Sequence, residues 1–244
     1  MIEVGADNST PDDSKKSLGT HALTCPTDEE VKKFKYRRRA VAFFVGGAGD
    51  KESYYGFGPE NNVNYARLPF DESVKKADYA PGVKSHHLGY NEVIGEKNIQ
   101  ANVLGELCKN DAVYIVGHSL GGWNGAHLSA ILSDLGYTVK MLVTLDPVGK
   151  GALVGSISNI YPDTPRPKAG LWINILAKSS ESNVSDWVAG VGEQWVLESG
   201  PNVNSIMDVN HDKAAVMFTT VLADGKSALH YMINSLNKYY RGEI

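Results

Sequence analysis

AVYIVGHSLGGWNGAHLSAILSDLG, residues 112–136, is the stretch that decides the fold. Its opening run, 112–116, is apolar, as is typical of a strand buried on both faces of a parallel sheet. From Leu120 the stretch has the length of a helix, and Gly136 supplies a C-terminal stop. Because Ser119 stands between the two, the stretch predicts a strand, a sharp turn and a helix in succession.

Apolar runs elsewhere extend this pattern along the chain. Three of them resemble 112–116 and are each followed by a loop with Gly, Pro, Ser or Asp: 41–45, 139–145 and 171–176. Helical spacing is expected over 91–107, 120–135, 212–223 and 226–240. Strands that alternate with helices predict an α/β fold, in which helices flank a mainly parallel sheet.

Length and composition limit the domain organisation and the partners. With 244 residues, we expect one domain over 21–244 and a mobile leader over 1–20, where the sequence is polar and aperiodic. The formal net charge of -4 argues against nucleic acid as a partner. Cys25 and Cys108 lack metal-ligand spacing and are most simply separate thiols, although a single bridge between them stays open. We expect neither a metal nor another cofactor.

The N-terminal residues bear on localisation. They are acidic and polar, without a basic flank followed by an apolar stretch, so no secretory signal is indicated. Nowhere does an apolar run approach the roughly 18 residues of a membrane span. We therefore expect a protein that is cytoplasmic on synthesis, with export by a signal-independent route left open. The sequence gives no indication of the oligomeric state.

Ser119 is the candidate nucleophile. A serine at a strand-to-helix turn sits in strained backbone, and small neighbours such as Gly117 and Gly121 let strand and helix approach. At the start of the helix, the N–H of Leu120 is placed to stabilise an oxyanion. The simpler interpretation is a glycine-rich turn without chemistry, but the strand and helix on either side favour a nucleophile.

These residues carry a family resemblance. His118-Ser119-Leu120-Gly121-Gly122 resembles the nucleophile elbow of lipases, and its pairing with Thr144-Leu145-Asp146-Pro147 resembles the arrangement in pancreatic-type lipases. The resemblance covers roughly 113–149. It implies an α/β-hydrolase fold and hydrolysis of carboxyl esters, with lipids among the substrates. A compact chain with such an elbow also looks like bacterial phospholipase toxins that a contractile secretion system delivers, although no motif singles out that group.

A serine hydroxyl needs a histidine base and a carboxylate that orients it. In this fold the chain order is serine, acid, histidine, which leaves His211 and His230 as bases. We prefer His211, in a polar loop, to His230, in the middle of an amphipathic helix. For the acid we prefer Asp146, which ends an apolar strand before Pro147, to Asp186, in a serine-rich loop after the next strand.

Three further segments are candidates for supporting roles. The loop after the first strand, Gly46-Gly47-Ala48-Gly49, is where this fold supplies its second oxyanion donor, and we expect the N–H of Gly47 or Ala48. Interpreted as a phosphate cradle, the loop lacks the Lys-Ser/Thr ending of a P-loop. Residues 149–170 are long for a connection and form a candidate lid. The basic run 32–39 is most simply a solvated helix face, but it would also suit transient contact with an anionic membrane surface.

The leading hypothesis is a serine hydrolase that cleaves carboxyl esters, of lipids or phospholipids, through an acyl-enzyme on Ser119. A thioesterase or an acyltransferase would use the same residues. A hydrolase-fold binding module without catalysis is the alternative from a different class, and the retained serine, acids and histidines argue against it.

Overall fold

The computed structural model describes residues 25–27, 29, 30, 38–53 and 58–244 of the chain. Six strands form one sheet: β1 (Ala40–Gly46), β2 (Val83–Gly89), β3 (Ala112–His118), β4 (Thr138–Leu145), β5 (Leu171–Ala177) and β6 (Val203–Met207). They lie in the order β2-β1-β3-β4-β5-β6, and every neighbouring pair is parallel. The predicted α/β class with a parallel sheet is confirmed, and the architecture is consistent with an α/β-hydrolase fold.

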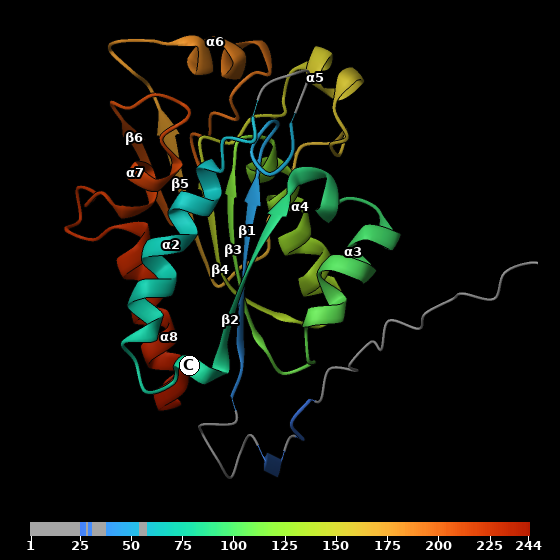
Figure 1. Cartoon of the computed structure of the whole chain (residues 1–244), viewed down its shortest axis with the longest axis vertical. Coiled ribbons are helices and arrows are strands. Elements are labelled where there is room, and N and C mark those ends of the chain that lie inside the picture. The colour runs from blue at the N-terminus through green and yellow to red at the C-terminus, as the bar shows by residue number, and fades with distance from the viewer. Residues whose placement is uncertain (1–24, 28, 31–37, 54–57) are drawn as a thin grey trace, which may run out of the picture.

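Helices cover both faces of the sheet (Figure 1). On one face lie α2 (Asn62–Lys75), α7 (Ala214–Thr219) and α8 (Ala228–Arg241), and on the other α3 (Glu96–Asn102) and α4 (Leu120–Asp134). Successive side chains of a strand point to opposite faces, and both faces are covered, so β1 is buried at every residue. Phe44 contacts Phe70 and Phe218 on one face, and Phe43 belongs to the core on the other.

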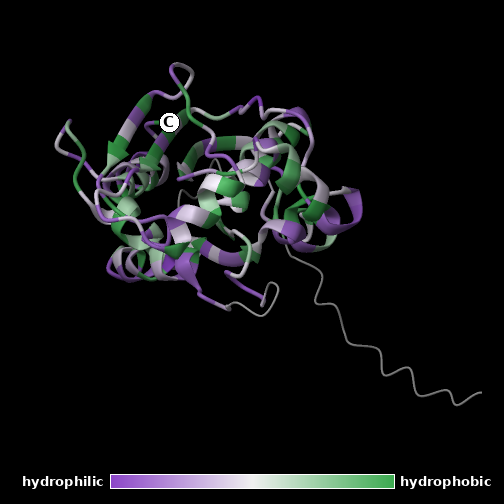
Figure 2. Cartoon of the chain, turned by 90° about the horizontal axis from the view of Figure 1, so that it is seen from above, coloured by the Kyte–Doolittle hydropathy of each residue, from purple (hydrophilic) through white to green (hydrophobic). Residues whose placement is uncertain are grey.

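The flanking helices differ in how much of their surface is buried: α8 has an apolar and a polar face, whereas α4 is buried along most of its length. Seen from above, they carry both apolar and hydrophilic residues (Figure 2), as expected of a layer with one face on the core and one in water. Among the described residues, no helix is both long enough and apolar enough to cross a membrane.

The two strands that the apolar runs did not predict are the edges of the sheet, β2 and β6. Their sequences, VKSHHLG and VNSIM, mix polar with apolar residues, and most of these residues are either partly buried or exposed. A strand at an edge has less of its surface covered, so it lacks the continuous apolar run by which the central strands were found.

Two helical predictions need correction. The helix expected over 91–107 is divided into η3 (Tyr90–Val93), α3 and η4 (Leu104–Glu106). Gly95, with a φ of 78°, separates η3 from α3, and Val103, with non-helical backbone angles, separates α3 from η4. The helix expected over 212–223 is shorter, since α7 begins only at Ala214 and ends at Thr219. Helix α2 was not predicted.

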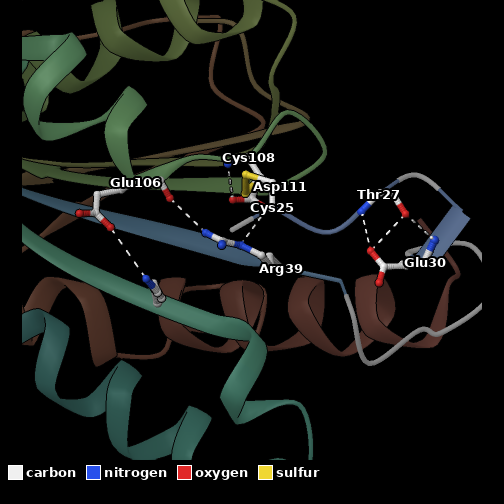
Figure 3. Close-up of a disulfide and its surroundings, with 8 residues drawn as sticks. Cys25, Thr27, Glu30, Arg39, Glu106, Cys108 and Asp111 are labelled. Atoms are coloured by element: carbon white, nitrogen blue, oxygen red, sulfur yellow. Dashed lines mark hydrogen bonds and ion pairs between the residues drawn. A yellow bond between two sulfur atoms is a disulfide. The ribbon is translucent and has the colours of Figure 1, made fainter. Parts of the chain in front are cut away.

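Cys25 and Cys108 form a disulfide, so the expectation of two separate thiols is wrong (Figure 3). The bridge joins residues that are 83 positions apart, a separation that carries no information about proximity. Beside it, Asp111 accepts a hydrogen bond from the N–H of Cys108 and pairs with Arg39 at 3.2 Å. The bridge lies just before β3, at the end of the sheet opposite Ser119.

Several predicted segments fall wholly or partly outside the described residues. The leader over 1–20 does so entirely. Of the basic run 32–39, the structure describes only Arg38 and Arg39, which bond to the carbonyl groups of Tyr239 and Glu106. These two arginines precede β1 and therefore lie at the end of the sheet away from Ser119.

Candidate active site

Ser119 occupies the turn between β3 and α4, with φ 57° and ψ -128°. Residues other than glycine rarely adopt these backbone angles, and such strain is typical of functional sites. The turn leaves no room beside it: a Cβ on Gly117 would lie 2.3 Å from the carbonyl oxygen of Gly121, and one on Gly121 would lie 2.1 Å from that of Val45. Glycine is therefore required at both positions for strand and helix to meet here.

The structure brings together the three preferred candidates, Ser119, Asp146 and His211. The Nε2 of His211 lies 3.0 Å from the Oγ of Ser119, and its Nδ1 lies 2.6 Å from the Oδ2 of Asp146. Ser119 follows β3, Asp146 follows β4, and His211 lies in the loop between β6 and α7. If Nδ1 carries the hydrogen shared with the carboxylate, Nε2 is free to accept the proton of the serine hydroxyl.

Asp146 is fully buried, and its carboxylate is well supplied with donors. Besides His211, its Oδ1 accepts hydrogen bonds from the N–H of Ala177 at 2.9 Å and from the Nε2 of Gln194 at 2.6 Å. A buried carboxylate is tolerated only when it is partnered in this way. Gln194 was not singled out in the sequence, because nothing in its neighbours indicates that it reaches β4.

Burial also affects His211. It lowers the pKa of the imidazole below its ordinary value of 6.5, while the hydrogen bond to Asp146 acts in the opposite direction and nearby His118 adds to the lowering. With a lowered pKa, the ring is neutral at neutral pH. A neutral imidazole is the form that can take a proton from a hydroxyl.

The two alternative candidates lie elsewhere. Asp186 binds the backbone of His211 rather than its ring: its carboxylate accepts from the N–H of His211 at 2.8 Å and from the Nδ2 of Asn210 at 2.7 Å. It also caps α6 (Val184–Val191) together with Asn183. The ring of His230 contacts the Oγ of Ser227 at the start of α8. Neither side chain joins the hydrogen-bonded row of Ser119, His211 and Asp146.

The predicted oxyanion residues surround Ser119. Gly47 packs directly against it, since a Cβ on Gly47 would lie 2.5 Å from the Cβ of Ser119. Ala48 and Leu120 line a cavity beside the serine. Within the described part of the chain, the N–H groups of Ala48 and Leu120 donate to no backbone or side-chain acceptor, so both are available to a bound oxygen atom.

The cavity above Ser119 has a volume of about 590 Å³ and is lined mainly by apolar side chains. Most of these come from two short helices at the top of the molecule, α5 (Ala152–Ile157) and α6, which we call the cap (Figure 1). The apolar lining residues of the cap are Val154, Ile157, Val184, Trp187, Val188, Ala189 and Val191. The candidate lid 149–170 thus contributes α5, whereas α6 was not predicted.

The cap also exposes large apolar side chains. The exposed fraction is 70% for Trp187 and 56% for Leu153. Of the two, Trp187 lines the cavity, and exposed apolar side chains beside an apolar cavity are typical of surfaces that bind an apolar ligand or partner.

Two comparisons with known proteins found no match. No family model matches the chain, and a search of curated proteins finds no similar sequence. What the protein does is therefore inferred from the chemistry of the site.

Proposed function

We propose that the protein is a serine hydrolase that cleaves carboxyl esters through an acyl-enzyme on Ser119. The observation that carries this proposal is the row of two hydrogen bonds, 3.0 Å from Ser119 to His211 and 2.6 Å from His211 to Asp146. In the first step the Oγ of Ser119 attacks the ester carbonyl carbon while Nε2 of His211 takes the hydroxyl proton. Asp146 holds the ring and stabilises the imidazolium that forms.

The tetrahedral intermediate places a negative charge on the former carbonyl oxygen. The N–H groups of Ala48 and Leu120 are the donors that we assign to this oxygen, with Gly47 keeping the loop against Ser119. When the intermediate collapses, the bond to the alcohol breaks and His211 gives its proton to the leaving oxygen. A water molecule, deprotonated by His211, then attacks the acyl-enzyme and releases the acid and Ser119.

The size and lining of the cavity support a lipid ester as substrate. An acyl chain would lie against the apolar side chains of the cap and leave its ester carbonyl at Ser119. The exposed Trp187 and Leu153 support transient contact of the cap with a lipid surface. Phospholipid esters belong to this substrate class, and the head group is a matter for experiment.

The disulfide supports a place of action outside the cytoplasm. Disulfides persist mainly in oxidising compartments, so the Cys25–Cys108 bridge favours export after synthesis. Cell fractionation followed by thiol alkylation tests this: we expect the alkylation-resistant protein in the exported fraction, and a fully alkylated protein confined to the cytoplasm would contradict it.

The proposed function is tested with a panel of triglycerides, phospholipids, thioesters and short esters, run on the wild type and on Ser119→Ala. We expect the wild type to hydrolyse esters and the variant to hydrolyse none while keeping its circular dichroism spectrum. Equal turnover by both proteins, or a folded wild type that hydrolyses no member of the panel and resists a fluorophosphonate probe, would contradict the proposal. The second result would favour a binding module.

A further inference from the structure

A second histidine, His118, binds the backbone of the candidate base His211. His118, at the end of β3 and next to Ser119, donates a hydrogen bond from Nε2 to the backbone carbonyl oxygen of His211 at 2.7 Å. The side chain of His118 is only 3% exposed, and the centroids of the two rings are 4.8 Å apart. His211 is thus held at its ring by Asp146 and at its carbonyl group by His118.

Asp50 lies on the other side of the His118 ring. Its Oδ2 is 3.9 Å from the Nδ1 of His118, and the same carboxylate accepts from the N–H of Val63 at 2.9 Å and contacts the Nε2 of His87 at 3.2 Å. Burial alone would raise the pKa of Asp50, but the two imidazoles and the N–H of Val63 lower it to about 2. Asp50 is therefore a buried anion.

The geometry decides which nitrogen of His118 carries a hydrogen. Because a carbonyl oxygen can only accept, Nε2 must be protonated to make the 2.7 Å bond. This leaves Nδ1 facing the carboxylate of Asp50, with no hydrogen-bond partner in the described structure. When Nδ1 also carries a hydrogen, the anion attracts the ring from the side opposite the carbonyl group and keeps Nε2 pointing at His211.

We propose that His118 is a positioning residue for the reaction, which Asp50 orients and which fixes the backbone of His211 so that its ring stays at Ser119. This inference rests on the proposed serine chemistry. His211 lies in a loop, where the N–H of its own peptide bonds to Asp186 at 2.8 Å and its carbonyl group bonds to His118. Removing the second bond leaves the backbone of His211 held only at its N–H, and a displacement of about 1 Å at a reacting group can cost on the order of 100-fold in rate.

Three variants test this role. His118→Leu removes the donor, whereas His118→Gln keeps an N–H donor near the position of Nε2. The matched control is His127→Leu, because Nε2 of His127 also bonds to a backbone carbonyl group, that of Asp163, at 2.7 Å but does not line the cavity. The readouts are the rate of labelling by a fluorophosphonate probe, and kcat and KM for a short ester, with melting curves as a check of folding.

We expect His118→Leu to lower the labelling rate and kcat about 10- to 100-fold with little change in KM, because positioning affects the chemical step. His118→Gln should recover most of this loss, and His127→Leu should behave as the wild type. A folded His118→Leu that labels at the wild-type rate would overturn the inference and leave the proposed function intact. The same holds if the Gln variant is folded but loses as much as the Leu variant.

If His118→Leu does not fold, Asp50→Asn is the second variant. It keeps an oxygen for the N–H of Val63 but removes the charge that orients His118. We expect slower labelling, by about tenfold, and labelling at the wild-type rate would overturn the inference. A wild type that never labels would instead refute the serine chemistry itself.

Discussion

Two regions meet at the cavity, and they are built differently. The carboxyl ends of β3 and β4, which carry Ser119 and Asp146, are closely packed by glycine contacts and joined to His211 by hydrogen bonds. The cap, α5 and α6, instead turns large apolar side chains such as Trp187 and Leu153 to the surface. We propose that the two regions have different roles: the strand ends hold the reacting groups in fixed geometry, and the cap offers an apolar surface to the substrate.

The two regions are joined at one side chain. Asp186 lies in the first turn of α6, and its carboxylate binds the N–H of His211. The residue that was the alternative acid thus connects the cap to the backbone of the candidate base. Variants on either side of this connection separate chemistry from substrate binding.

The largest expected effect belongs to the serine. Ser119→Ala removes the attacking oxygen, so we expect kcat for a short ester to fall on the order of 10⁴- to 10⁶-fold. Since the alanine side chain is smaller, the melting temperature should stay close to that of the wild type. Steady-state kinetics with calorimetry checks both, and substantial activity in the variant would remove the basis for assigning chemistry to the strand ends.

The two acids differ in what they bind, and their amide variants should differ accordingly. Asp146→Asn disturbs the bond to Nδ1 of His211, and we expect kcat to fall about 10³- to 10⁴-fold. Asp186→Asn keeps an oxygen for the N–H of His211, and about a tenfold loss or less is expected. Measuring kcat of both variants on the same ester shows which carboxylate is the acid of the site. The reverse order of effects would assign the acid to Asp186.

The pH profile tests the state of His211. Catalysis needs the neutral ring, so kcat/KM should fall as the pH drops through the pKa of His211 and the ring gains a proton. Because burial lowers that pKa, the midpoint of the acid limb should lie below the ordinary histidine value of 6.5. A midpoint above 6.5, measured between pH 4 and 9 with a substrate that does not titrate, would show that Asp146 outweighs burial.

The cap should affect binding rather than chemistry. Trp187→Ala removes apolar area at the cavity mouth, so we expect the KM of a long-chain ester to rise about tenfold while values for a short ester stay unchanged. Ile206→Ala is the control, since Ile206 is also exposed, at 64%, but does not line the cavity. Equal losses on both esters would place the effect of Trp187 in the chemical step.

The disulfide gives the smallest expected effect on turnover. It lies at the end of the sheet away from Ser119, and we expect Cys25→Ser with Cys108→Ser to leave kcat unchanged. The free energy of unfolding should fall by about 4 kcal/mol, because opening a loop of this length adds entropy to the unfolded chain. Denaturant titration measures the second quantity. A large loss of kcat in a folded variant would show that the two ends of the sheet are coupled.

The sequence predicted the parts of the molecule whose structure is determined by residues that are neighbours in the chain. The four central strands are covered on both faces, so each is mainly apolar, and Ser119 is marked by the strand and helix beside it. Asp146 and His211 followed from the chain order of the resembled fold. These predictions needed only neighbouring residues and one rule of topology.

What the sequence did not predict depends on contacts between distant segments. The edge strands are only half covered, and Gln194, Asp50 and the partner of Cys25 act across separations that no local pattern encodes. His118 was assigned to the elbow without a role, because its contact with His211 spans 93 residues. The segment of α6 was interpreted as a serine-rich loop. Its apolar side chains line the cavity, a contact that depends on the fold as a whole.

The central claim is that His211 and Asp146 make Ser119 a nucleophile. Its most direct measurement is the site of covalent labelling: the folded wild type is treated with a fluorophosphonate probe, digested and mapped by mass spectrometry. We predict one adduct on Ser119, lost in Ser119→Ala and strongly slowed in His211→Ala. A folded wild type that takes up no probe, or an adduct on another serine that persists in Ser119→Ala, would contradict the claim.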